Sequence, residues 1–195
     1  MSHDLAGRAD RASRNAALVL GLTLPGDTVL YLLLPLHAAI FGVTLAEAGL
    51  LLAANRLVRI AGYGWVARGY RRFGPRLACL AAVLGAALAA LGYALTTGLW
   101  WLLAARLVWG LSFAAMNIAT QALATALAVG AARRSGQSRA IIAAGPMLGL
   151  LGGAGLAERA GPQLVFLLMA AGALLALPVA LLLPGGGGGQ VHAPW

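Results

Sequence analysis

Asp27 is the residue of this chain whose chemistry is hardest to explain as packing. It lies within a long apolar stretch, residues 18–41, directly after the helix-breaking pair Pro25 and Gly26. At a helical rise of about 1.5 Å per residue, its carboxylate lies about 16 Å into that stretch, near the middle of a hydrocarbon core about 30 Å thick. An ionisable group is kept at that depth where it faces a bundle interior, a partner or water. The structural alternative is that Asp27 only solvates the break beside it.

A stripe of polar and small residues recurs further along the chain. Arg106, Gly110, Phe113, Asn117 and Gln121 follow one another at helical intervals, which predicts one shared helical face. Two earlier stretches add to this set: Thr23, Asp27 and Tyr31 share one face, and Asn55 and Arg59 lie one turn apart beside Arg56.

Length arithmetic places Asp27, Asn55, Arg56 and Arg106 at a similar depth, which predicts a central polar cavity. Burial favours the neutral form of Asp27, whereas a neighbouring Arg106 favours the carboxylate, so separating the two residues would load or release a proton. An Asp27–Arg106 pair would leave Arg56 without a counter-ion, which favours an anionic or zwitterionic substrate. Arg106 could instead only lock helices together.

Composition identifies the class of protein that must position these residues. With 61% hydrophobic residues, 10% charged residues and a mean hydropathy of +0.86, the chain is an integral membrane protein. The net charge of +9 comes from arginines that flank or interrupt apolar spans, so we expect a lipid bilayer and not a nucleic acid as partner. No catalytic constellation appears, so we expect no enzyme. The single cysteine, Cys79, and three scattered histidines predict neither a metal site nor a cofactor.

The expected architecture is an all-α membrane protein of six transmembrane helices. The spans are expected at 16–41, 44–66, 77–97, 99–129, 140–157 and 163–183, within a transmembrane domain 16–184. Residues 1–15 form an N-terminal tail and the glycine-rich residues 185–195 a flexible C-terminal tail. The third and sixth spans are free of charge and should face lipid, whereas the other four should line an interior.

Arginine placement predicts the topology. The arginines concentrate in the N-terminal tail and in the second-to-third and fourth-to-fifth connections, which fall on one side: Arg8, Arg11 and Arg14; Arg68, Arg71, Arg72 and Arg76; Arg133, Arg134 and Arg139. Positive residues mark cytoplasmic loops, so both termini are expected to be cytoplasmic in a multi-pass protein of the plasma or inner membrane. Residues 71–77 also resemble residues 158–164, which suggests a 3+3 inverted repeat.

At three places the chain resembles the N-terminal half of a major facilitator superfamily transporter. Residues 72–76 resemble the loop between helices two and three, with Gly74 and Arg76 matching and Arg71 standing at the usual aspartate. Residues 106–110 resemble the Arg-x-x-Gln-Gly pattern of the fourth helix, with Trp109 in place of glutamine. Gly145, Pro146 and Gly149 resemble the fifth-helix element associated with antiporters.

The resemblance implies secondary active transport of a small solute, with proton coupling expected through Asp27. Arg71, Arg72, Gly74 and Arg76 would form the gating loop. Because six helices make half of such a transporter, we expect a truncated piece, a half that pairs with a second six-helix half, or a homodimer. The alternative is a non-transporting membrane protein that acts in assembly or regulation.

Overall fold

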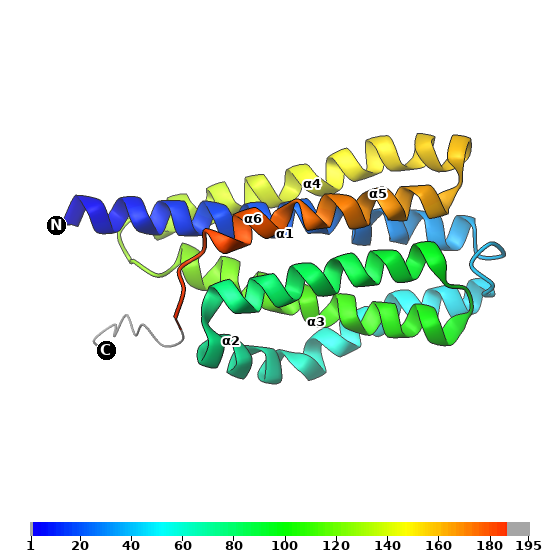
Figure 1. Cartoon of the computed structure of the whole chain (residues 1–195), viewed down its shortest axis with the longest axis horizontal. Helices are drawn as coiled ribbons and strands as arrows, with labels where there is room; N and C mark the ends of the chain where they lie inside the picture. Colours follow the sequence, from blue (N-terminus) through cyan, green and yellow to red (C-terminus); the bar gives the residue numbers. More distant parts are fainter. Residues whose placement is uncertain (1, 187–195) are drawn as a thin grey trace.

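A computed structural model describes residues 2–186, and its regular structure over these residues is entirely helical (Figure 1). The helices are α1 (Ser2–Leu36), α2 (Leu45–Leu95), α3 (Leu99–Ala124), α4 (Ala131–Ala160), α5 (Pro162–Leu174) and α6 (Ala176–Leu181). Five helical stretches are long and apolar enough to cross a membrane, with α5 and α6 counted together. The predicted all-α membrane class is therefore confirmed. Most of the expected C-terminal tail, residues 187–195, lies outside the described residues.

Helix α2 differs most from the sequence prediction. It runs through 51 residues without a loop, although the spans 44–66 and 77–97 were expected to be separate helices. A straight helix of that length would extend about 76 Å, more than twice the hydrocarbon thickness. Gly74 breaks it, with φ 79° and ψ 172°, and the chain turns back there (Figure 1). Five membrane-length helical stretches are therefore counted where six separate spans were expected, and α2 consists of two limbs, 45–73 and 75–95.

The turn at Gly74 follows directly from local chemistry. A φ of 79° lies in the region that only glycine enters without strain. Pro75 follows, and its ring disfavours helical geometry at the preceding residue and supplies no N–H for a helical hydrogen bond. Helical residues continue up to this point on both sides, so no extended loop is needed.

Other helix ends also differ from the expected boundaries. Helix α1 begins at Ser2, so the segment expected as a tail continues the first span as helix. It ends at Leu36, not at residue 41, and a short turn leads to Thr44. The Thr44 hydroxyl accepts from the Glu47 N–H, while the Glu47 carboxylate accepts from the Thr44 N–H, which fixes where α2 begins. Helix α3 stops at Ala124, short of the expected residue 129.

Helices α1 and α4 cross closely because small residues lie at their contact. A Cβ at Gly145 would collide with the carbonyl oxygen of Gly21, and a Cβ at Gly149 would lie 2.9 Å from Pro25 Cβ. Gly153, one turn further, meets Val29 in the same way. Glycines at four-residue intervals allow membrane helices to approach closely. The glycines at 145, 149 and 153 therefore form the surface of α4 that packs against α1.

Burial within this chain does not follow the charge content of the spans. Helix α4 was expected to line an interior, yet its only buried residues among those described are Arg134, Ser138, Gly149, Gly153 and Ala157. The limb 75–95, expected to face lipid, buries a row of alanines and exposes leucines such as Leu84 and Leu88. The charge content of a span therefore does not predict its burial, because the uncharged alanine face of the limb 75–95 packs against other helices.

Figure 1 shows how the connections are distributed over the two ends of the bundle. The N-terminus, the Gly74 turn and the connection from α3 to α4 lie at one end, and the connections after α1 and α2 lie at the other. The arginine-rich segments of the sequence therefore share one end of the molecule.

Candidate functional site

The Asp27 carboxylate lies at the centre of a buried ion cluster. Its Oδ1 accepts a hydrogen bond from Arg106 Nη1 at 2.5 Å, and its Oδ2 accepts one from Arg59 Nη2 at 3.3 Å. Asp27 is 8% exposed and the Arg106 side chain is fully buried, whereas 25% of the Arg59 side chain is exposed. One carboxylate is thus shared by two guanidinium groups, and the cluster carries one surplus positive charge.

Arg106 is held on several sides. Its Nε donates to the carbonyl oxygen of Leu51 at 3.3 Å, and its guanidinium lies 5.1 Å from the centre of the Tyr31 ring. A buried charge is costly unless it is paired and hydrogen-bonded, and these contacts satisfy Nε and Nη1, whereas Nη2 has no hydrogen-bond partner among the described residues.

Arg59 is held more loosely than Arg106. Its guanidinium carbon lies 3.6 Å from the centre of the Phe113 ring, a cation–π contact. Its Nε is buried and finds no hydrogen-bond partner among the described residues. Arg106 Nη2 likewise has no partner among the described residues, so the two cationic partners of Asp27 differ in exposure, and only Arg59 has partial access to the surroundings.

A polar pocket of about 550 Å³ lies between α1, α3 and α4. Its lining includes Phe113, Asn117, Gln121, Ser138 and Arg139 and contains no carboxylate among the described residues. Phe113 is shared by the pocket and by the stacking contact with Arg59, so the ion cluster and the pocket meet at this ring. A volume of this size is typical of a small-molecule site.

The two amides of the predicted stripe are linked to each other. Asn117 Nδ2 donates to the Tyr63 hydroxyl at 3.0 Å, and Gln121 Nε2 donates to Asn117 Oδ1 at 3.3 Å. Exposure rises along the stripe, from the buried Arg106 through Asn117 to the exposed Gln121. Tyr63, on the first limb of α2, was not singled out in the sequence.

Two predicted residues of the first limb of α2 lie in different environments. Asn55 is fully buried against Gly110, and neither of its amide atoms has a hydrogen-bond partner among the described residues. Arg56 is exposed and does not join the ion cluster, and Arg59 takes that position. The sequence spacing already favoured Arg59 over Arg56. Arg59 lies one turn after the buried Asn55, on the same helical face, whereas Arg56 is rotated by about 100° from Asn55 around the helix.

The predicted gating-loop residues lie at the Gly74 turn, outside the ion cluster. Arg76 Nε donates to the carbonyl oxygen of Leu183 at 2.8 Å, which ties the turn to the end of α6. Arg71 and Arg72 are exposed, and the Arg72 guanidinium lies 5.4 Å from the centre of the Phe73 ring.

A second ion cluster, not foreseen from the sequence, joins the N-terminal turns of α1 to the start of α4. Asp10 pairs with Arg133 and with Arg134. Arg134 also donates to three carbonyl oxygens at and after the end of α3, those of Ala124, Leu127 and Val129. The hydrogen bond from Arg133 lowers the pKa of Asp10 below its ordinary value.

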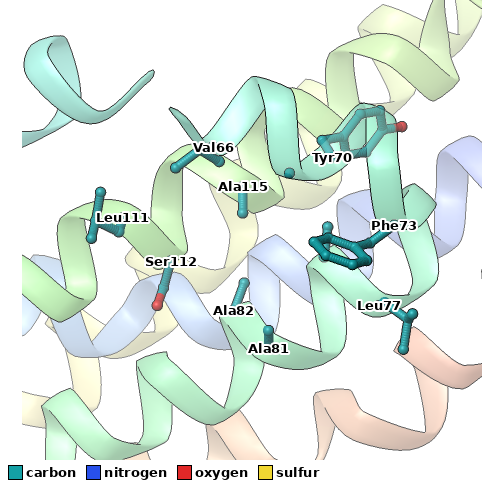
Figure 2. A pocket seen from close by; sticks show the side chains of 11 residues that line it. Val66, Tyr70, Phe73, Leu77, Ala81, Ala82, Leu111, Ser112 and Ala115 are labelled. Carbon is teal, nitrogen blue, oxygen red and sulfur yellow. The ribbon is translucent and has the colours of Figure 1, made fainter. Parts of the chain in front are cut away.

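A largely apolar pocket of about 500 Å³ lies between the two limbs of α2 and α3 (Figure 2). Figure 2 shows Tyr70 and Phe73 near the turn, with Leu111, Ser112 and Ala115 contributed by α3. The pocket contains none of the predicted site residues, and no charged side chain lines it among the described residues. Its chemistry does not suit a charged solute.

No cluster of three or more His, Cys, Asp or Glu side chains that could hold a metal ion occurs in the described part of the chain. No curated protein matches the sequence. A family profile described as Major Facilitator Superfamily matches residues 16–190, which spans nearly all of the helices described above. The chain therefore belongs to the Major Facilitator Superfamily, whose members are membrane transporters and not enzymes.

Proposed function

We propose that this chain is half of a secondary active transporter that moves a small anionic or zwitterionic solute coupled to a proton on Asp27. One observation carries the proposal: a single buried carboxylate shared by Arg106 and Arg59, next to a pocket that no carboxylate lines among the described residues.

The substrate would bind where the ion cluster meets the pocket. An incoming carboxylate or phosphate would pair with Arg59, because this arginine is partly exposed and makes the longer bond to Asp27. Arg139 would supply a second positive charge within the pocket lining, and the Asn117–Gln121 pair would supply neutral donors and acceptors. This role for Arg59 replaces the one expected for Arg56.

Proton coupling follows from the shared carboxylate. When Arg59 turns toward a bound anion, Asp27 loses one of its two cationic partners, and its neutral form becomes more favourable. The anion and the proton would then bind together. Release of the anion would return Arg59 to Asp27 and expel the proton.

We propose that the helices cross the membrane six times as a 3+3 inverted repeat. The two limbs of α2 would form two crossings, and α5 with α6 would form one. The end that carries the arginine-rich segments would face the cytoplasm, with both termini there. The membrane would be the plasma or inner membrane.

A second six-helix unit would complete the transport path. Large apolar side chains are exposed along the first limb of α2 and along α4, including Leu57, Ile60, Leu148 and Leu151. The α4 residues lie on the helix that also contributes Ser138, Arg139 and Pro146 to the polar pocket. A separately encoded half, the missing part of a truncated chain or a second copy would cover this face.

Transport into proteoliposomes with an imposed pH gradient tests the proposal. The chain would be reconstituted alone and with a candidate second half, and uptake of labelled mono- and dicarboxylates would be measured. We expect gradient-driven uptake only with a covering partner, and its loss in Asp27→Asn. Uptake that does not respond to the pH gradient would refute proton coupling. No uptake in either preparation would favour the non-transporting alternative.

A further inference from the structure

The geometry points to a binding site for one water molecule behind the Asp27 carboxylate, held by Asp27, Tyr93 and Trp109. This deepens the proposed function, because the water would be a third partner of the carboxylate assigned to the proton. The site itself rests on a cavity and on unpaired buried atoms. Its test does not depend on transport.

A small cavity lies beside Asp27, between α1, the second limb of α2, α3 and α5. The residues that line it are Thr23, Gly26, Asp27, Ala86, Ala90, Tyr93, Trp109, Met169 and Ala173. The space open to the centre of a water-sized sphere is about 10 Å³. That is about the room that one water molecule needs.

Two polar side chains that line this cavity have unpaired buried atoms. By hydrogen-bond geometry, the Tyr93 hydroxyl and Trp109 Nε1 have no partner among the described residues, and the Arg106 guanidinium lies near the Tyr93 hydroxyl without a well-formed hydrogen bond to it. Each of the two residues is 3% exposed, so bulk water does not reach them. Buried hydroxyl and indole N–H groups normally find a partner, and an ordered internal water is a usual one.

The cavity also offers a suitable set of donors and acceptors. Trp109 Nε1 can only donate, the Tyr93 hydroxyl can donate or accept, and the carboxylate of Asp27 can only accept. One water molecule would accept from Trp109, exchange a hydrogen bond with Tyr93 and donate to Asp27. Internal waters usually make two to four such bonds. Thr23 is not needed, because its hydroxyl already donates to the carbonyl oxygens of Val19 and Leu20.

The titratable groups that face Asp27 from the packed helices are two arginines and two tyrosines. Arg59 on the first limb of α2 and Arg106 on α3 bind its two oxygens. Tyr31 of α1 lies against Arg106, and Tyr93 approaches from the second limb of α2. From α5 the cavity receives only Met169 and Ala173, which carry no titratable group.

Filling the cavity tests the site, because a dry and a hydrated cavity respond with opposite signs. Gly26→Ala would add a methyl group whose nearest neighbour is Met169 Cβ at 3.4 Å, an ordinary contact distance. In a dry cavity the methyl group would stabilise the protein through added contacts and helix propensity. In a hydrated cavity it would displace the water and leave Tyr93 and Trp109 unpaired.

Gly172→Ala is the matched control. Gly172 is also a half-exposed helical glycine, and a Cβ there would meet nothing within 4 Å. Thermal unfolding of the purified chain would be followed by the labelling of Cys79, which is the only cysteine and is buried. We expect Gly26→Ala to unfold at least about 2–4 °C below Gly172→Ala, the shift typical of one lost buried interaction in a chain of this size.

A second variant separates water displacement from steric strain. Tyr93→Phe removes one hydrogen-bond partner of the water and keeps the ring, so the penalty of Gly26→Ala should shrink in this background. If Gly26→Ala stabilises the chain as much as Gly172→Ala does, the cavity is dry and the inference is overturned. An unchanged penalty in the Tyr93→Phe background would also overturn it, because the loss would then be steric.

Discussion

At the residue scale, the distinctive feature of this protein is the unequal hold of two arginines on one aspartate. Arg106 is fully buried, bonded to Asp27 and anchored to the Leu51 carbonyl oxygen. Arg59 makes the longer bond, stacks on Phe113 and is partly exposed. In the proposed mechanism, Arg106 is the permanent partner of Asp27 and Arg59 is the partner that exchanges.

Replacing Arg59 should therefore affect transport far more than replacing its neighbour. We expect Arg59→Gln to abolish binding of the anionic substrate, because glutamine has neither the positive charge nor the paired N–H donors of a guanidinium group. Arg56→Gln is the matched control, since Arg56 is exposed on the same helix and outside the cluster. Uptake assays of both variants with a covering partner would measure the difference. Equal losses in the two variants would show that overall positive charge matters and that the cluster does not.

The Asp10 cluster predicts a defined dependence of stability on pH. The pKa of Asp10 is lowered in the folded chain, chiefly by the hydrogen bond from Arg133, so its ion pairs stabilise the fold above the ordinary pKa of an aspartate. This stabilisation is lost as the pH falls through the lowered pKa. We expect Asp10→Asn to lower the unfolding temperature at pH 7 and to have a smaller effect at pH 3, where part of the stabilisation has been lost.

Asp4→Asn provides the control for Asp10→Asn. Asp4 pairs with Arg8 one turn away on the same exposed helix surface, an ion pair of little energetic value. Its replacement should change the unfolding temperature only slightly at either pH. A pH-independent effect of Asp10→Asn would contradict the assignment of its stabilising role to the ion pairs.

At the element scale, the contact between α1 and α4 depends on the absence of side chains. Gly145 and Gly149 of α4 pack against Gly21 and Pro25 of α1, where even a Cβ does not fit. The polar pocket lies between these same helices and α3, so the crossing sets the width of the pocket. Gly145, Pro146 and Gly149 thus affect the pocket indirectly, because they set how closely α1 and α4 pack beside it.

This packing predicts a sharp difference between two glycines of α4. Gly149→Ala should destabilise the chain by about 1–3 kcal/mol, the usual cost of overpacking a close contact. Gly152→Ala should be neutral or slightly stabilising, because a Cβ there would meet nothing within 4 Å and alanine favours helix. Thermal unfolding monitored at Cys79 would compare the two. Similar effects would indicate that the crossing can relax and that the glycines are not required.

At the scale of the whole molecule, the buried ion cluster and the exposed apolar faces indicate which surface is incomplete. The leucines of the limb 75–95 form a face suited to lipid, whereas α4 combines exposed leucines with residues of the polar pocket. In the proposed transporter, a second six-helix unit would cover the helix that borders this pocket and exposes its other residues. The covering unit should therefore contact α4.

Cross-linking can locate this interface. In a Cys79→Ala background, a cysteine at Leu151 on α4 should form cross-links to a second six-helix unit or to a second copy. A cysteine at Leu88, on the exposed face of the limb 75–95, should not. Gel analysis of membranes treated with an oxidant would score both positions. Cross-linking at Leu88 alone would place the interface on the opposite face and contradict the proposed arrangement.

The sequence alone determined the membrane class, the apolar stretches, the polar stripe of α3 and the depth of Asp27, because hydrophobic length and helical periodicity are local properties. The Gly74 turn was also encoded locally, although its tightness, which leaves α2 without a loop, was not foreseen. Only the tertiary structure decided that Arg59 and not Arg56 reaches Asp27, that Asp10 joins Arg133, and that Tyr93 and Trp109 line one small cavity. The two ion pairs join residues 32 and 123 positions apart. Their partners depend on helix rotation and crossing, which the close fit of glycines and side chains sets.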